Sequence, residues 1–180
     1  MNNTVQHWKE ISRESVFSKY GRGVEKRVYQ LPNGKEADFY LNTSDHDSVA
    51  CLALTKDNHV VLAKQFRPGP AEILLEMPGG SLKDGEDPET AIQRELLEET
   101  GYRGKAQYVG STFSDAYEPR RKNVFCITEC EKIAEPMLED NGESIEVALL
   151  SMQEFRDLLR SGRMTDVELG YLALDFLKLL

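Results

Sequence analysis

Three glutamates at helical spacing are the residues of this sequence best suited to chemistry. Glu95, Glu98 and Glu99 stand at positions i, i+3 and i+4, which places their carboxylates within one narrow arc of an α-helix. Like charges at these spacings destabilise an isolated helix by roughly 0.2–0.5 kcal/mol per pair, so the arrangement needs a counter-charge. A hard divalent cation such as Mg²⁺ or Mn²⁺ prefers oxygen ligands of this kind. We therefore predict a metal site, against the alternative of a solvated acidic face in which Arg94 pairs with Glu98.

The helix that carries these glutamates is marked at both ends. Asp87 is a good N-cap, Pro88 suits the first helical position, and Gly101 can adopt the left-handed conformation that ends a helix. Ile92 and Leu96 lie beside the acidic arc and are expected to face a core. The sequence thus predicts a helix with a buried side next to its acidic side.

A longer pattern surrounds the helix, from Gly79 to Tyr102. Within it, five residues separate Gly80 from Glu86, and seven more lead to the Arg94-Glu95-Leu96 triplet. The pattern resembles the Nudix box, with Tyr102 in place of the usual aliphatic residue at its end. The resemblance implies a Nudix hydrolase, in which metal-bound carboxylates face a diphosphate linked to another group and water cleaves that diphosphate.

The resemblance also implies a role for each residue of the box. Glu95 and Glu99 would be the principal metal ligands, Glu98 an auxiliary ligand, and the carbonyl of Gly79 a further one. Arg94 would hold the glutamates in place. The implied cofactor is Mg²⁺, with Mn²⁺ as an alternative.

Two segments before the box narrow the resemblance to one branch of the family. KQFRPG and EILLEMPGG look like the corresponding segments of the ADP-ribose pyrophosphatases, where the arginine contacts substrate phosphate. This makes Arg67 a substrate-binding candidate, although by itself it could equally be a structural ion-pair partner. The implied reaction converts ADP-ribose to AMP and ribose 5-phosphate. The alternatives are another nucleotide sugar of the GDP-mannose type, a dinucleotide, or a non-catalytic nucleotide-binding module.

A polar stretch from Ser114 to Asn123 is predicted to be a loop between strands at 107–113 and 124–129. Its Tyr117 could stack on a base or pack locally, and the cations that begin at Arg120 could bind phosphate or keep the loop solvated. We take Tyr117 and Arg120 as substrate-binding candidates. The proline characteristic of the ADP-ribose branch would be Pro119, which lies slightly beyond the usual spacing.

A second, acidic loop precedes a predicted strand at 144–150. In the related pyrophosphatases a glutamate of this loop is the catalytic base, and Glu143 matches it best, with Glu139 as the second choice. The alternative is an exposed turn rich in acid.

Composition limits the class of protein. The chain has 180 residues, 40% hydrophobic and 29% charged, as expected for one globular domain with an ample core. A formal net charge of −9 argues against a nucleic-acid or anionic-membrane surface. The absence of a signal peptide or long apolar span, with the odd number of cysteines, predicts free thiols in a reducing cytoplasm. Cys126 and Cys130 are expected on the same face of a strand, as packing residues.

The remaining patterns predict an α/β fold, a Nudix-type α/β/α sandwich of mixed sheet and helices. Residues 1–44 form an N-terminal β-hairpin extension around Asn33-Gly34, and residues 45–180 form the Nudix hydrolase domain. The domain should contain a hairpin at 49–65, a short strand at 72–77, and two final helices opened by capping boxes, one beginning at Ser151 and the other at Thr165. Since a hairpin alone is marginally stable, it must dock on the domain or on a second subunit, and we expect a homodimer.

Overall fold

The structure of this chain is a computed structural model that describes residues 4–137 and 144–180. The chain divides into two compact units. The first contains the residues up to His46 together with Phe113–Arg120, and the second contains the described residues of Asp47–Thr112 and Arg121–Leu180. The division into an extension of residues 1–44 and a domain of residues 45–180 stays a prediction.

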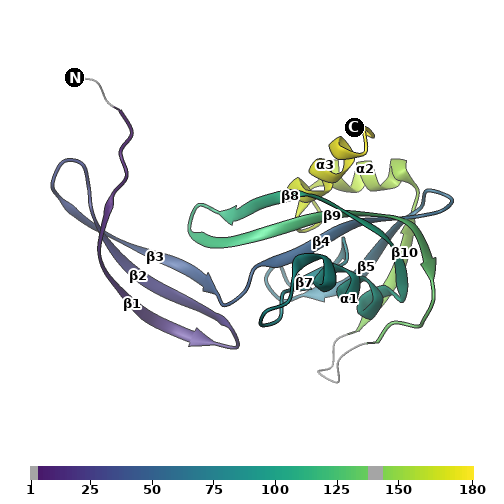
Figure 1. Ribbon diagram of the computed structural model, residues 1–180, viewed down its shortest axis with the longest axis horizontal. Coiled ribbons are helices and arrows are strands. Elements are labelled where there is room, and N and C mark those ends of the chain that lie inside the picture. Colours follow the sequence, from purple (N-terminus) through teal and green to yellow (C-terminus); the bar gives the residue numbers. More distant parts are fainter. Residues whose placement is uncertain (1–3, 138–143) are drawn as a thin grey trace. The chain divides into compact units, whose positions relative to one another are not determined.

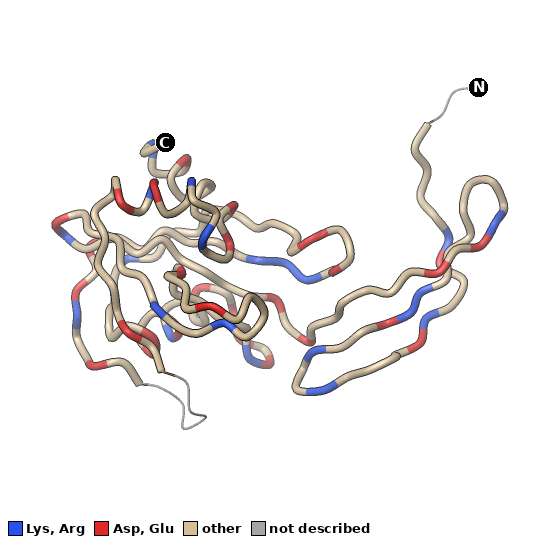
Figure 2. Tube along the Cα trace, turned by 180° about the vertical axis from the view of Figure 1, so that it is seen from behind, with Lys and Arg blue, Asp and Glu red and all other residues tan. Residues whose placement is uncertain are grey.

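The first unit is built on an antiparallel sheet in the order β1-β2-β3, with β1 at Lys9–Lys19, β2 at Arg22–Gln30 and β3 at Glu36–Ser44 (Figure 1). The predicted hairpin is β2 and β3, and Gly34 in its turn has a φ of 81°. Basic and acidic residues are interspersed along the traces of these strands (Figure 2).

Strand β1 is present although the sequence did not predict it. All 11 of its side chains are exposed, so it lacks the alternation of apolar and polar residues that marks a half-buried strand. Its pairing with β2 also shifts register twice. Three aromatic rings, Trp8, Tyr29 and Phe39, lie with centroids 5.5 to 6.2 Å apart and join the start of this strand to its neighbours. A third strand with such a cluster weakens the expectation that this region needs a partner to be stable.

The second unit is organised around a mixed sheet in the order β10-β5-β4-β9-β8, with β6 paired to β5 and β7 paired to β4. β4 and β9 are parallel, whereas β5 pairs antiparallel with β4, β6 and β10. The bounds of the strands are β4 Ser48–Thr55, β5 Val60–Arg67, β6 Glu72–Glu76, β7 Gly79–Ser81, β8 Tyr102–Asp115, β9 Glu118–Lys132 and β10 Ile145–Leu150.

Helices cover both faces of this sheet, with α1 (Pro88–Thr100) on one face and α2 (Met152–Ser161) and α3 (Val167–Phe176) on the other (Figure 1). The side chains of β4 alternate between two cores. Ala50, Leu52 and Leu54 pack in the cluster that contains α2 and α3, whereas Val49, Cys51 and Ala53 pack in the cluster that contains α1. The predicted α/β sandwich with a mixed sheet is confirmed. No helix in the described part of the chain is long and apolar enough to cross a membrane.

The loop predicted from Ser114 to Asn123 is wrong. β8 and β9 continue through most of it and are joined by a two-residue turn at Ala116 and Tyr117. The three cations of this stretch lie along β9, where they form a blue run beside the turn in Figure 2. Each has a partner in the fold, namely Glu118 for Arg120, Ser111 for Arg121, and both Asp166 and Glu168 for Lys122. The sequence alone suggests a solvated loop, because the partners of Arg121 and Lys122 lie 10 to 46 positions away in the chain.

The expectation that Cys126 and Cys130 share a face is also wrong. Glu129 has a φ of 55°, and the pairing with β4 moves from Ala53↔Ile127 to Thr55↔Cys130, which inserts one extra residue into β9. This bulge turns Cys130 into the core under α1, whereas Cys126 lies in the core under α2 and α3. Burial raises the pKa of Cys126 to about 12 and that of Cys130 to about 11, as expected for packing thiols.

The two final helices begin differently. At α2 the predicted capping box is confirmed, because Ser151 and Glu154 each bond to the backbone of the other. At α3 the predicted capping box is absent: the N-cap is Asp166, which has a φ of 55° and makes no side-chain cap. The hydroxyl of Thr165 donates instead to the carboxylate of Glu76 on β6.

Candidate active site

The site begins where β7 lies against β4 and the chain turns toward α1. A Cβ atom at Gly79 would lie 2.2 Å from the carbonyl oxygen of Val49, and one at Gly80 would lie 2.4 Å from Oε1 of Glu95. The contact at Gly79 is with backbone, so only glycine allows this strand to run so close to β4, whereas a side chain at Gly80 would displace the carboxylate of Glu95. The two glycines thus bring the backbone of β7 to the carboxylates of α1.

Helix α1 has the ends that its sequence predicts. The side chain of Asp87 accepts hydrogen bonds from the backbone N–H groups of Glu89 and Thr90, Pro88 opens the helix, and Gly101 ends it with a φ of 74°. Its buried side includes Ile92 and Leu96. These anchors fix the rotation of the helix, and with it the direction of its acidic side.

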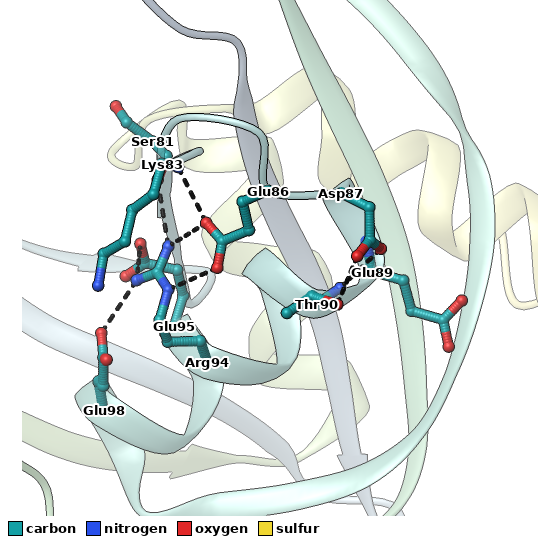
Figure 3. Close-up of polar contacts among 9 residues, drawn as sticks. All are labelled: Ser81, Lys83, Glu86, Asp87, Glu89, Thr90, Arg94, Glu95 and Glu98. Atoms are coloured by element: carbon teal, nitrogen blue, oxygen red, sulfur yellow. Dashed lines mark hydrogen bonds and ion pairs between the residues drawn. The ribbon is translucent and has the colours of Figure 1, made fainter.

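Arg94 is the centre of the charged contacts on this acidic side (Figure 3). Its Nε and Nη2 atoms donate to the two carboxylate oxygens of Glu86 at 2.8 and 2.9 Å. Its Nη1 donates to Glu95 at 2.7 Å and to Glu98 at 3.0 Å. The fork of Arg94 holds the pKa of Glu86 down to about 2. The pairing of Arg94 with Glu98 is therefore part of a larger network rather than an isolated pair on a solvated face.

Glu99 is hydrogen-bonded to β7 rather than to Arg94. Its Oε2 accepts a hydrogen bond of 3.0 Å from the backbone N–H of Gly79. Burial raises the pKa of Glu99 to about 8, against the lowering effects of the Gly79 N–H and the Arg67 charge. Burial also raises the pKa of Glu95. At both carboxylates the effect of burial on the pKa thus outweighs that of the nearby positive charges.

Arg67 stands close enough to influence Glu99 and is tied to a buried acid. Its Nε donates to Oε2 of Glu76, whose side chain is 2% exposed, while the side chain of Arg67 is 39% exposed. Among the described residues, the two terminal nitrogens of Arg67 have no partner. Arg67 therefore forms a structural ion pair through one nitrogen, and its role in substrate binding stays a prediction.

The acidic residues of α1 and the backbone of β7 offer the oxygen ligands that a hard divalent cation prefers. All the candidate donors of Glu95, Glu98, Glu99 and the Gly79 carbonyl are oxygens, and two of the carboxylates are buried enough to disfavour their charged forms. Within the described ranges, no three acidic, histidine or cysteine side chains already converge as they would around a metal ion. Glu95 and Glu98 are turned to Arg94, and Glu99 is turned to Gly79. Binding of a cation would require some of these side chains to exchange partners.

Four other site residues were also predicted. Tyr117, 55% exposed, and Arg120, paired with Glu118 at 3.0 Å, belong to the first unit. Glu143 and the second choice, Glu139, lie outside the described residues. The roles of these four residues stay predictions.

Sequence reasoning missed the part played by two residues. Glu86 anchors Arg94 through both carboxylate oxygens, and its fixed place in the box pattern was the available signal. Thr165 contacts Glu76 across 89 positions of sequence, and its pattern resembled a helix cap, so no local signal pointed to the contact.

Comparisons with known proteins agree with this geometry. A family model described as the NUDIX domain matches residues 44–169. The chain is 32% identical over 179 residues to an ADP-ribose pyrophosphatase of Bacillus subtilis (strain 168), covering 95% of this chain and 92% of that protein. It is 40% identical over 107 residues to an ADP-sugar pyrophosphatase of Mus musculus, covering 53% of this chain and 49% of that protein. A crystal structure of an ADP compounds hydrolase shares the fold, with a TM-score of 0.81 at 18% identity, and covers 99% of this chain and 100% of that one.

Proposed function

Because this chain belongs to the Nudix family, we propose that it is a metal-dependent hydrolase that cleaves the diphosphate of ADP-ribose, giving AMP and ribose 5-phosphate. The proposal is carried by one observation in the second unit. Glu99 lies close enough to both Glu95, which is bonded to Arg94, and Arg67 for each to affect its pKa. Buried carboxylates suit a metal, and a guanidinium whose terminal nitrogens have no partner among the described residues suits a phosphate. The B. subtilis relative, similar over nearly its whole length, supports the choice of substrate.

Nudix hydrolases generally require a divalent metal, and here we propose Mg²⁺, with Mn²⁺ as an alternative. Glu95, Glu98, Glu99 and the carbonyl of Gly79 would hold it. A bound divalent ion would neutralise the diphosphate and lower the pKa of a water molecule. The protein's own contribution is positional, since Arg94 orients Glu95 and Glu98, and Arg67 donates to a phosphate oxygen.

A glutamate before β10 completes this proposal. Glu143 would accept the proton of the attacking water, as its position before Ile145 implies by resemblance. Tyr117 and Arg120 are proposed to contact the substrate through stacking and a charged hydrogen bond, respectively. We also propose a reducing, cytoplasmic location, supported by the three free cysteines.

ADP-sugars other than ADP-ribose are the second candidate, because the mouse relative is an ADP-sugar pyrophosphatase. A panel of ADP-ribose, ADP-glucose, GDP-mannose, a diadenosine polyphosphate and NADH separates these candidates. Products are measured as phosphate released by a coupled phosphatase, with Mg²⁺ and then Mn²⁺. We expect ADP-ribose to give the highest kcat/KM. A preference for GDP-mannose would overturn the substrate assignment, and hydrolysis of none would favour a nucleotide-binding module.

Replacing Arg67 by alanine should raise KM for ADP-ribose more than it lowers kcat. This is expected if the guanidinium binds phosphate equally in the ground and transition states. The variant also leaves Glu76 buried without its cation, so thermal unfolding is measured alongside the kinetics. Lys64→Ala, which removes an exposed ion pair of the same strand, is the matched control. An unchanged KM for Arg67→Ala would return this residue to a purely structural role.

We further propose a homodimer in which the first unit takes part in pairing. Val16 and Phe17 of β1 are 54% and 57% exposed, which leaves apolar surface on an edge strand. Light scattering of the intact chain at micromolar concentration should report a dimer. Deletion of the residues before Asp45 should give a monomer that binds Mg²⁺ and has lost most of its affinity for nucleotide. A monomeric intact chain would refute the proposal.

A further inference from the structure

A buried carboxylate connects the segment before α3 to the arginine of the site. Glu76, at the end of β6, is 2% exposed and uses both of its oxygens. Oε2 accepts from Nε of Arg67, and Oε1 accepts from the hydroxyl of Thr165. Burying a carboxylate is costly unless its oxygens are hydrogen-bonded, and these two donors satisfy both oxygens of Glu76 inside the unit.

The segment that carries Thr165 is held along β6 at three successive residues. Arg163 pairs with Glu72 at 2.7 Å, Met164 is buried in the core with α2 and α3, and Thr165 reaches Glu76. Glu72 and Glu76 stand four positions apart on the strand and therefore point to the same face. Burial of Met164 anchors the backbone that delivers the hydroxyl of Thr165 to Glu76, whereas the exposed Arg163–Glu72 pair adds little to this anchor.

This contact restricts how Glu76 can hold Arg67. The carboxylate has rotational freedom about its terminal bond when only one oxygen is bonded, and the Thr165 hydroxyl removes that freedom by fixing the second oxygen. A fixed carboxylate then orients the guanidinium plane through the Nε–H bond. The terminal nitrogens of Arg67 have no partner among the described residues and are left to bind a ligand.

We propose that Thr165 and Glu76 are positioning residues that preset the guanidinium of Arg67 to receive a phosphate oxygen of the substrate. The inference rests on the proposed function and deepens it. Neither residue touches the substrate; each acts through Arg67. Presetting the guanidinium lowers the entropy lost when phosphate binds, so disturbing it weakens substrate affinity.

The test compares Thr165→Val with Thr165→Ser in the full-length chain. Valine keeps the shape but removes the hydroxyl, whereas serine keeps the hydroxyl. We expect Thr165→Val to raise KM for ADP-ribose roughly 5- to 20-fold, with a smaller change in kcat; this is less than the full effect of one lost hydrogen bond to a charged group, because Thr165 acts on the substrate only through Arg67. Thr165→Ser should stay within about twofold of wild type by the same reasoning. The Kd of α,β-methylene ADP-ribose should rise in parallel with KM.

A matched control separates the hydroxyl from the docking of its segment. Arg163→Ala breaks an ion pair whose side chains are 68% and 48% exposed, two residues from Thr165, and should leave KM and kcat unchanged. In an Arg67→Ala background, Thr165→Val should add less than about a twofold change in KM, because the group it positions is gone. This loss of additivity is not expected of a merely structural residue.

Three outcomes would overturn the inference. One is a Thr165→Val variant, folded by thermal unfolding, with KM and Kd within twofold of wild type. Another is an equal effect from Arg163→Ala, which would assign the change to docking of the segment. The third is a double variant in which Thr165→Val raises KM by the same factor in the Arg67→Ala background as in the wild-type protein. If the wild-type protein hydrolyses no substrate, the proposed function is wrong, and the Kd comparison with the analogue still decides this inference.

Discussion

Replacing Glu99 by glutamine should lower kcat by several orders of magnitude at saturating Mg²⁺ while the protein stays folded. Neutralisation of the diphosphate by metal is a large part of the rate enhancement, and glutamine removes one charged ligand. Stability should change little, because burial already raises the pKa of Glu99 to about 8 and the glutamine side-chain oxygen can still accept the hydrogen bond from Gly79. The measurements are kcat for ADP-ribose hydrolysis and the thermal unfolding curve.

A control on the same helix makes this result specific. Glu89→Gln removes an exposed acid from the first turn of α1 and should leave kcat unaffected. Calorimetry should show Mg²⁺ binding to wild type and to Glu89→Gln, with weaker binding to Glu99→Gln. A kcat for Glu99→Gln within a few-fold of wild type would contradict the assignment of Glu99 as a metal ligand.

Replacing Arg94 by alanine should have the second large effect, on both stability and activity. Arg94 donates to Glu86, Glu95 and Glu98, and its side chain is only 18% exposed. Its loss leaves largely buried carboxylates without a cation, which should lower the free energy of unfolding by about 3 kcal/mol. Arg94→Lys keeps a charge without the two-pronged contact to Glu86, so it should recover only part of the loss. Urea unfolding at pH 7 measures these differences.

The same variant should change how stability depends on pH. In the native protein Arg94 lowers the pKa of Glu86 from 4.5 to about 2, so this pair stabilises the fold above pH 4.5. That contribution declines as the pH falls from 4.5 toward 2, because Glu86 becomes protonated. Arg94→Ala should lose this part of the acid dependence. Arg103→Ala, which removes an exposed cation just after the helix, should retain it, and an unchanged pH profile in Arg94→Ala would contradict the role of the pair.

The parts of this protein that its sequence predicted are those encoded by neighbouring residues. Asp87, Pro88 and Gly101 mark the ends of α1 because a cap needs only groups within one helical turn. The i, i+3, i+4 spacing of the glutamates brings them to one side of the helix for the same reason. The hairpins β2–β3 and β4–β5 were also predictable, since turn chemistry and alternation lie within a few positions.

The misassigned elements are those whose partners lie elsewhere in the chain. Strand β1 has no buried face to produce an alternating pattern. The cations after the β8–β9 turn resembled a solvated loop, yet Lys122 pairs with residues 44 and 46 positions away. The bulge at Glu129, which sends Cys126 and Cys130 to opposite cores, depends on the pairing of β9 with β4.

The sequence by itself therefore determined the family, the helix and the residues of the acidic site, because spacing along one element decides them. The tertiary structure alone decided which charges meet. Arg94 joins Glu86 to Glu95 and Glu98. Glu76 accepts hydrogen bonds from both Arg67 and Thr165, and Thr165 lies 89 positions from Glu76 in the sequence. Contacts of this kind form only when separate elements pack on one sheet, so they cannot be predicted from the spacing of neighbouring residues.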